Sequence, residues 1–383
     1  MKAGAGLSTT AHGRTAAVEA ALEARTALDG ATADLALVFA SPHFASDAAS
    51  VLDAVHEAAG PGAVVGCVAE GVVGGAREIE SEAAVSVWLA ALGAPVETFH
   101  ATFARLGDAG AFSGWPEADG SFLLLCDPAS FPADALLDYL NEHSPRTRVV
   151  GGLAGAGGRG GARLFVDRDV VTGGAVGVRL PDDVSVVPLV SQGCRPVGSP
   201  LTVTKAEGNV IYELAGKPPV EHLRTLYASL PEDDRRLLGE GLLLGRIIDE
   251  YKSEFEAGDF LVRAVMGADA DNGAIAVGDV VDVGEAVQFH VRDARSADDD
   301  LRATLAAARA VLAGRSASGA LLFTCNGRGV RMFGAPDHDA RLVAAELGAP
   351  VAGFFCAGEL GPVGGRNFLH GFTASLAVFA DGA

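Results

Sequence analysis

The sequence lacks the features that mark several large classes of protein. Its longest candidate for a membrane span, LLLGRII at residues 242–248, is far too short to cross a bilayer. The N-terminus has no unbroken apolar stretch of the kind found in secretory leaders. No run of five basic residues occurs and the net charge is −20, which disfavours nucleic acids and anionic membranes as partners.

Cysteine and histidine are sparse and scattered. The five cysteines are far apart, odd in number and never spaced as CxxC, a pattern typical of reduced thiols. No HxH, HExxH or Cys/His cluster has the spacing of metal ligands, so we expect neither a structural metal nor a cofactor. Together these absences favour a cytoplasmic protein.

The chain repeats one plan of elements. Glycine-rich turns follow apolar strands at residues 61–76, 146–161 and 349–365. A helix-like segment precedes each of these strands, a buried-type strand precedes that helix, and a further apolar strand follows the turn. The first and last copies begin earlier, with a strand and a helix, and for the last copy the expected strand is EAVQFHVRD at residues 285–293.

The repeat predicts an α/β fold in two related halves. Each half reads strand–helix–strand–helix–strand–strand, and mixed sheets are expected because the final strands are too close for a helical crossover. We place the division at LAGKPP, giving domains 1–215 and 216–383.

A G-x-G-x-x-G pattern occurs at Gly155, Gly157 and Gly160. A dinucleotide fingerprint needs a helix after the turn, and here the next segment, ARLFVDRDVV, is strand-like. We interpret the pattern as a turn.

Polar residues follow the buried strand of the last copy, in FTCNGRGVRMFG at residues 323–334. In open α/β sheets ligands bind at the carboxyl ends of strands. Cys325, Asn326 and Arg328 are therefore candidate ligand contacts, with the arginine suited to a carboxylate. The alternative is a plain turn with a solvated arginine.

Two cysteines, Cys325 and Cys356, end strands in this half, which also contains His290, His338 and His370. A nucleophilic cysteine needs a nearby histidine, so a cysteine-dependent enzyme is one hypothesis. The other is that the thiols only pack as small apolar groups.

Matching glutamates, Glu70 and Glu359, stand just past the strand in two copies. A lone glutamate in a glycine turn is usually solvated, but the shared position in two copies also points to a functional role, as the partner of a ligand ammonium or of an arginine. Arg77 follows the first turn, and Arg366 and Asn367 follow the second, so these three are further candidates for the polar site.

At these turns the sequence resembles the FIST family of paired N-terminal and C-terminal sensory domains. The resemblance rests on VVGCVAEGVVGGAREIE, VVGGLAGAG and VSQGCRPVGSPLTVTKAEGNVIYELAGKPP in the first part. In the second part it rests on GALLFTCNGRGVRMFG and PVAGFFCAGELGPVGGRNFLHGFTASLAVF.

The resemblance implies a small-ligand-binding protein of signal transduction, with an amino acid as the hypothetical ligand. No catalytic mechanism and no cofactor come with it. Because the sequence contains no kinase, cyclase, chemoreceptor or F-box segment, we expect its output to pass through a separate signalling protein. A cysteine-dependent enzyme and a scaffold protein stay open as alternatives.

Overall fold

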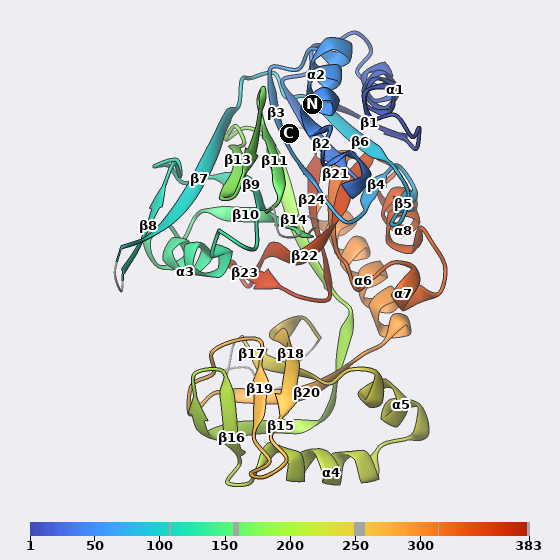
Figure 1. Cartoon of the computed structure of the whole chain (residues 1–383). Helices are drawn as coiled ribbons and strands as arrows, with labels where there is room; N and C mark the ends of the chain where they lie inside the picture. The colour runs from blue at the N-terminus through green and yellow to red at the C-terminus, as the bar shows by residue number, and fades with distance from the viewer. Residues whose placement is uncertain (107–108, 156–160, 249–256, 313, 381–383) are drawn as a thin grey trace. The chain divides into compact units, whose positions relative to one another are not determined.

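The computed structural model describes residues 1–106, 109–155, 161–248, 257–312 and 314–380. The chain forms two compact units, here called unit 1 (residues 1–191 with 301–383) and unit 2 (residues 192–300) (Figure 1). Residues 215 and 216, where the sequence analysis places its division, both lie inside unit 2. Leu214 and Val220 on either side of that point belong to one hydrophobic cluster of unit 2.

The expected α/β fold with mixed sheets is confirmed. One sheet of unit 1 has the order β1 (Lys2–Ser8), β6 (Val85–Ala91), β2 (Leu35–Ala40), β3 (Ala63–Val68), β11 (Arg163–Val166), β12 (Asp169–Thr172). The other has the order β14 (Ser185–Gln192), β24 (Thr373–Ala380), β21 (Ala317–Cys325), β22 (Val351–Val363), β10 (Arg148–Ala154), β9 (Ser121–Cys126), β13 (Ala175–Arg179), β7 (Glu97–Leu106), β8 (Ala109–Ser113). Three short strands attach to its path: β4 (Val72–Gly74), β5 (Arg77–Ile79) and β23 (Arg366–His370).

Helices cover these sheets. They are α1 (Gly13–Thr26), α2 (Ala48–Ala59), α3 (Ala133–His143), α6 (Ala294–Leu312), α7 (Val330–Phe333) and α8 (His338–Leu347), with a 3-10 turn η1 (Pro42–Phe44). Among the helices in the described ranges, none is both long and apolar enough to span a membrane.

The sequence repeat is a repeat of topology, and it occurs three times in unit 1. In each copy two parallel strands flank a helix, and the strand after the glycine turn pairs antiparallel with the first of them. The copies are β2–α2–β3 with β6, β9–α3–β10 with β13, and β21–α8–β22 with β24. In each sheet one more strand follows the antiparallel one: β1 lies next to β6, β7 next to β13, and β14 next to β24.

The assignment of one strand to the last copy was wrong. Residues 285–293 were expected to begin that copy, but they form β20 (Ala286–Arg292), which belongs to unit 2. Val287, Phe289 and Val291 alternate into the core of unit 2, which explains why the segment pairs there. The strand next to β24 is β14 instead.

The three copies join in a ring through the hairpins that follow their glycine turns. Strand β4 of the first copy pairs with β22 of the last, the end of β22 pairs with β10 of the middle copy, and β11 of the middle copy pairs with β3 of the first. Each hairpin therefore completes the sheet of the next copy.

One glycine recurs at the same place in the second parallel strand of every copy. A β-carbon there would lie 2.0, 1.9 or 1.8 Å from the carbonyl oxygen of the residue paired with it on the first strand. The pairs are Gly66 with Val38, Gly151 with Leu124, and Gly353 with Leu322. Only glycine permits the two backbones to approach so closely.

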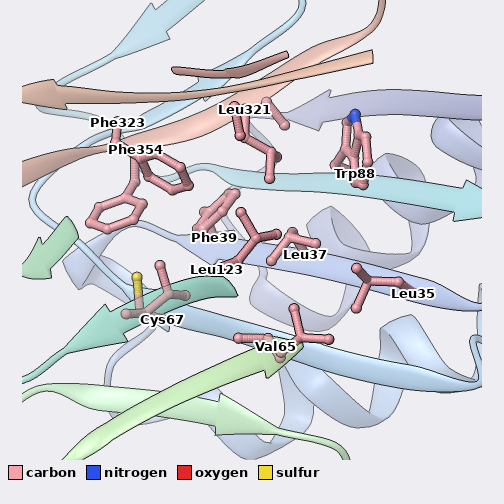
Figure 2. Close-up of a cluster of buried hydrophobic side chains, with 14 of the residues drawn as sticks. Leu35, Leu37, Phe39, Val65, Cys67, Trp88, Leu123, Leu321, Phe323 and Phe354 are labelled. Carbon is pink, nitrogen blue, oxygen red and sulfur yellow. The ribbon is translucent and has the colours of Figure 1, made fainter. Parts of the chain in front are cut away.

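The two sheets of unit 1 pack face to face, with helices on the outside. Along β2, Leu35, Leu37 and Phe39 enter the cluster between the sheets, while Ala36 and Val38 face α1 and α2. This alternation follows from the two-residue period of a strand. Figure 2 shows Phe39, Phe323 and Phe354 gathered between the sheets, with Phe39 and Phe354 ring centroids 5.2 Å apart. Helix α3 covers β9, and α6 and α8 cover β21.

Unit 2 is built around a small closed barrel. Its strands are, in order, β15 (Cys194–Glu207), β16 (Val210–Leu214), β19 (Ile275–Val277), β18 (Phe260–Ala268), β17 (Leu243–Ile247) and β20. Helices α4 (Pro219–Ser229) and α5 (Glu232–Glu240) and the 3-10 turn η3 (Ala257–Asp259) complete it.

Candidate functional site

The predicted polar residues of two copies meet at the carboxyl ends of their strands. A β-carbon placed on Gly155 would lie 3.0 Å from Asn326 Nδ2 and 3.1 Å from Glu70 Oε1. Three segments of unit 1, following β3, β10 and β21, therefore converge on one point. Of the G-x-G-x-x-G pattern, only Gly155 is among the described residues, because Gly157 and Gly160 lie outside them.

The turn after β21 holds Asn326 in place through the backbone. Its N–H donates to Cys356 O at 2.8 Å, and the N–H of Arg328 donates to Cys325 O at 2.8 Å. The N–H of Gly327 lies 3.4 Å from Cys325 Sγ. This tight turn holds Asn326 where its amide lies close to Gly155.

The side chains at this point differ in exposure. Glu70 is exposed and Asn326 is half-buried. Asn326 Oδ1 is itself shielded from solvent and accepts no hydrogen bond from any residue in the described part of the chain. A buried amide oxygen without a donor costs free energy, so it is a place where a ligand donor is favourable.

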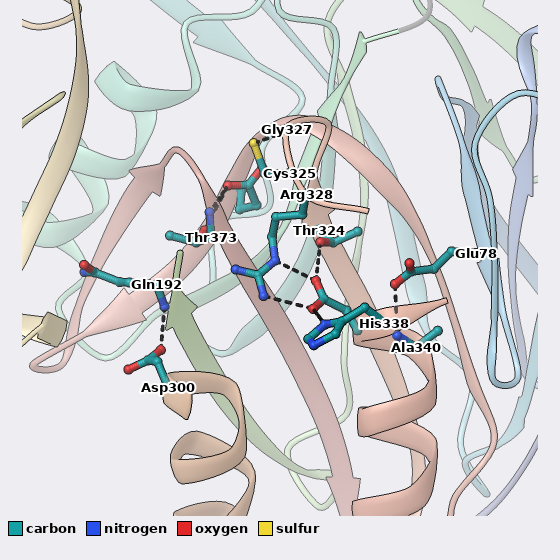
Figure 3. Close-up of polar contacts among 12 residues, drawn as sticks. Glu78, Gln192, Asp300, Thr324, Cys325, Gly327, Arg328, His338, Ala340 and Thr373 are labelled. Atoms are coloured by element: carbon teal, nitrogen blue, oxygen red, sulfur yellow. Dashed lines mark hydrogen bonds and ion pairs between the residues drawn. The ribbon is translucent and has the colours of Figure 1, made fainter. Parts of the chain in front are cut away.

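Arg328 is completely buried and is held by an acid that sequence analysis missed. Its Nε donates to Asp339 Oδ2 at 2.6 Å and its Nη2 donates to Asp339 Oδ1 at 2.9 Å. Figure 3 shows the guanidinium aimed at this carboxylate, beside His338 and Thr324. Burial acts against charge on Asp339, but Arg328 and the neighbouring hydrogen bonds hold its pKa well below the usual range.

The guanidinium keeps one free position. Arg328 Nη1 is buried and donates to no residue that the structure describes. Asp339 already accepts hydrogen bonds from Nε and Nη2, so only Nη1 is left to bind the carboxylate of a ligand. The aromatic ring of Phe333 lies 5.3 Å from the guanidinium carbon and stacks on His338.

Glu359 is buried and lies within β22, whereas Glu70 is exposed and follows the end of β3, so the two glutamates do not occupy equivalent positions. Its Oε2 accepts hydrogen bonds from the Thr373 N–H at 3.1 Å and from Thr373 Oγ1 at 2.9 Å. Burial raises the pKa of Glu359 to about 8, against the opposing effects of Thr373, the Arg328 charge and the Cys325 thiol. The Cys325 thiol is near enough to lower the pKa of the Glu359 carboxyl group. No described residue, however, donates a hydrogen bond of good geometry to Glu359 Oε1.

Two glutamates of the first copy accept hydrogen bonds from backbone N–H groups of the last copy. Glu78 Oε1 accepts from the N–H of Ala340 at 2.9 Å, and Glu80 Oε1 accepts from the N–H of Val330 at 2.9 Å. Burial and then the charge of Asp339 raise the pKa of Glu78 to about 7. The two glutamates thus anchor α7 and α8, on either side of the arginine.

Three predicted residues do not join this site. Arg77 and Arg366 are exposed at the tips of their hairpins. Arg366 is four residue pairs from Glu359 along β22, roughly 13 Å. Asn367 is buried and bonded to β10 and to the loop before it: Val149 N–H donates to its Oδ1 at 3.0 Å, and its Nδ2 donates to Thr147 O at 3.0 Å.

The contacts that the structure describes for Cys356 and for the histidines of this half do not favour a cysteine nucleophile. Burial raises the pKa of Cys356 well above its usual value, with Glu359 and two other thiols adding to the effect. His338 Nδ1 lies 2.9 Å from Asp339 Oδ1, and His370 Nε2 lies 2.9 Å from Gly361 O. His290 belongs to unit 2. All five cysteines are free thiols, and Cys325 is the half-buried one.

Sequence analysis missed several residues of the site because they lie in no recognisable motif. Asp339 and Thr373 carry no glycine-turn signature, and Glu80 reads as one more surface acid. The available signal for Asp339 was its place at the start of an amphipathic helix, on the same face as Leu342 and Val343. Within the described residues no group of His, Cys, Asp and Glu has the geometry to hold a metal ion.

Comparison with known proteins agrees with the glycine-turn pattern. Residues 34–217 match the FIST N domain and residues 220–362 match the FIST C domain. Uncharacterized proteins of Mycobacterium tuberculosis (strain H37Rv) and Mycobacterium bovis (strain AF2122/97) are each 50% identical to this chain over 386 residues. The match covers 100% of this chain and 100% and 99% of those two proteins. The chain therefore belongs to the FIST family, whose domains are sensory domains of signal transduction.

Proposed function

We propose that the protein senses a small polar metabolite, an amino acid, which binds in unit 1 where Glu70 and Asn326 converge. The observation that carries the proposal is this convergence on Gly155, together with the buried Asn326 Oδ1 that has no donor among the described residues. A ligand ammonium supplies such a donor.

The groups at this point match both ends of a zwitterion. The Glu70 carboxylate and Asn326 Oδ1 accept from an ammonium, while Asn326 Nδ2 donates to a carboxylate. Two further buried polar atoms of the last copy have no partner among the described residues: the donor Arg328 Nη1 and the Glu359 carboxyl oxygen Oε1. Arg77, Arg366 and Asn367 take no part, because the first two sit at hairpin tips and the amide of Asn367 is already bonded.

The expected output is the binding of a separate signalling protein. The two copies that provide Glu70 and Asn326 are also tied together by Glu78 and Glu80, so a ligand that draws them together acts on α7 and α8. We place this activity in the cytoplasm, where the five free thiols stay reduced.

A thermal-shift screen of the twenty amino acids at millimolar concentration tests the proposal. Binding to the folded state raises the melting temperature, and a ligand at 100 times its Kd adds about 2.7 kcal/mol of stability. The stabilisation should be lost in Asn326→Ala and reduced in Glu70→Gln, and kept in the control Glu82→Gln, which changes an exposed acid. If no amino acid stabilises the wild-type protein, the proposal is wrong.

A further inference from the structure

Unit 2 contains a cavity of about 330 Å³ between strand β15 and helix α4. Every residue that lines it belongs to unit 2, so it is unrelated to the glycine turns of unit 1. Its lining residues are Val197, Gly198, Ser199, Leu201, Lys217, Glu221, His222, Thr225, Leu226, Ser229 and Phe289.

Strand β15 is irregular where it lines the cavity. The pairing of β15 with β20 shifts register between Val197 and Leu201. Gly198 has a φ of +72°, which favours glycine, and its carbonyl accepts a hydrogen bond of 2.7 Å from Gln288 Nε2. The bulge is therefore held by Gln288 of β20, and a β-carbon on Gly198 would lie only 2.9 Å from Leu226 Cδ1 of α4.

The floor of the cavity is apolar. Val197 and Phe289 are buried, and Leu201 and Leu226 are half-buried beside them. A volume of this size accommodates a molecule of amino-acid size with an aliphatic or aromatic body.

The α4 side of the cavity is rich in acceptors. Thr225 Oγ1 donates to Glu221 O at 3.0 Å, and Ser229 Oγ donates to Leu226 O at 2.7 Å. Both hydroxyl hydrogens are thus used, and the oxygens present only lone pairs to a ligand. His222 Nε2 lies 2.7 Å from Leu214 O, which assigns the proton to Nε2 and leaves Nδ1 as an acceptor in the neutral ring.

Two opposite charges line the same cavity without neutralising each other. Lys217 and Glu221 are both exposed, and in the described part of the chain neither forms an ion pair with the other. Each charge is left to attract the opposite charge of a ligand.

We propose that this cavity binds an amphipathic zwitterion, a molecule with an ammonium and a carboxylate at one end of an apolar body. Lys217 and the Ser199 hydroxyl bind the carboxylate, Glu221 and the α4 oxygens bind the ammonium, and the apolar floor holds the body. This site is additional to the one proposed in unit 1.

Three probes that share one carbon skeleton test the charge pattern: norleucine, hexanoate (norleucine without the ammonium) and pentylamine (norleucine without the carboxylate), titrated into the full-length protein by calorimetry. We expect norleucine to bind at least about 10-fold more tightly than hexanoate or pentylamine, since each of these lacks one charged contact. Equal affinity for norleucine and either single-charge probe would overturn the proposal, as would no norleucine binding at millimolar concentration.

Substitutions locate the binding. Lys217→Met and Glu221→Gln should each weaken norleucine binding about 10-fold or more, and the exposed barrel controls Lys205→Met and Glu207→Gln should not. Asn326→Ala should also leave it unchanged, which separates this site from the one in unit 1. Binding that survives both Lys217→Met and Glu221→Gln would show that norleucine binds elsewhere and would refute the assignment.

Discussion

The guanidinium of Arg328 and the carboxylate of Asp339 form a fully buried bidentate ion pair, with N–O distances of 2.6 and 2.9 Å. Thr324 Oγ1 also donates to Asp339, at 3.0 Å. The pair links the turn after β21 to the start of α8, and so connects the polar site of unit 1 to the helix that the first copy anchors.

Removing one partner of this pair should be strongly destabilising. Arg328→Met leaves Asp339 as a buried charge without a counter-ion, and Asp339→Asn does the same to Arg328, so each should lower the free energy of unfolding by about 3–5 kcal/mol. Urea denaturation measures the change, with Arg331→Met as the exposed control. A loss below about 1 kcal/mol in both variants would contradict the buried pair.

Stability should fall as pH rises through neutrality because of Glu359. Burial raises its pKa from 4.5 in the reference state to about 8 in the folded protein. Between these values the unfolded chain loses the proton that the folded protein keeps, so folding becomes less favourable as pH increases and levels off above 8. Glu78, with a pKa of about 7, adds to the fall at lower pH.

Glu359→Gln measures this contribution, because the amide is neutral at every pH. The difference in unfolding free energy between variant and wild type should move in favour of the variant from pH 5 to pH 8. Glu82→Gln should show no such trend. A difference that is constant with pH would mean that Glu359 is ionised in the folded protein throughout.

The recurrent glycine should tolerate no side chain. In Gly66→Ala or Gly353→Ala the added methyl group would meet a carbonyl oxygen at 2.0 or 1.8 Å, so the paired strands would have to separate. We expect a loss at or above the upper end of about 1–3 kcal/mol, the usual cost of overpacking. Gly239→Ala in α5 is the matched control, since a β-carbon there meets no atom within 4 Å. Near-wild-type stability of Gly353→Ala would refute the close strand approach.

The buried thiols should be unreactive in the native state. Burial raises the pKa of Cys67, Cys126 and Cys356, so thiolate is scarce at neutral pH as well as inaccessible. Iodoacetamide at pH 7.5 should modify these three at least about 100-fold more slowly in native than in urea-unfolded protein, since each unit of raised pKa removes tenfold thiolate. Fast native labelling of Cys356, read by peptide mass spectrometry, would revive the enzyme hypothesis.

Sequence periodicity predicted the repeated α/β plan because glycine turns and apolar strands are local features. The place of β20 was not predictable in this way: its alternating apolar residues suit any sheet with one buried face, and only tertiary packing assigns them to the barrel. Likewise the motif shared by Glu70 and Glu359 predicted equivalent surroundings, but Thr373 covers one of them and solvent reaches the other.

The candidate site was partly predictable. Asn326 and Glu70 each follow the carboxyl end of a strand, where ligand contacts are expected. Strands β21 and β3 belong to different sheets, so tertiary packing, and not strand pairing, brings the two side chains together. The partner of Arg328 could not be inferred, because a buried ion pair between a turn and a helix leaves no spacing rule in the sequence. Arg77 and Arg366 were placed in the site by proximity in sequence, whereas the hairpins carry them away from it.

The proposed function requires that an amino acid ligand contact Asn326. Protein labelled with ¹⁵N only at its five asparagines gives side-chain amide signals that Asn326→Ala assigns. On titration with the amino acid that gives the largest thermal shift, the Asn326 amide signals should move and saturate, while those of Asn141 and Asn209 should stay in place. Saturating ligand with an unmoved Asn326 signal would contradict the proposed site.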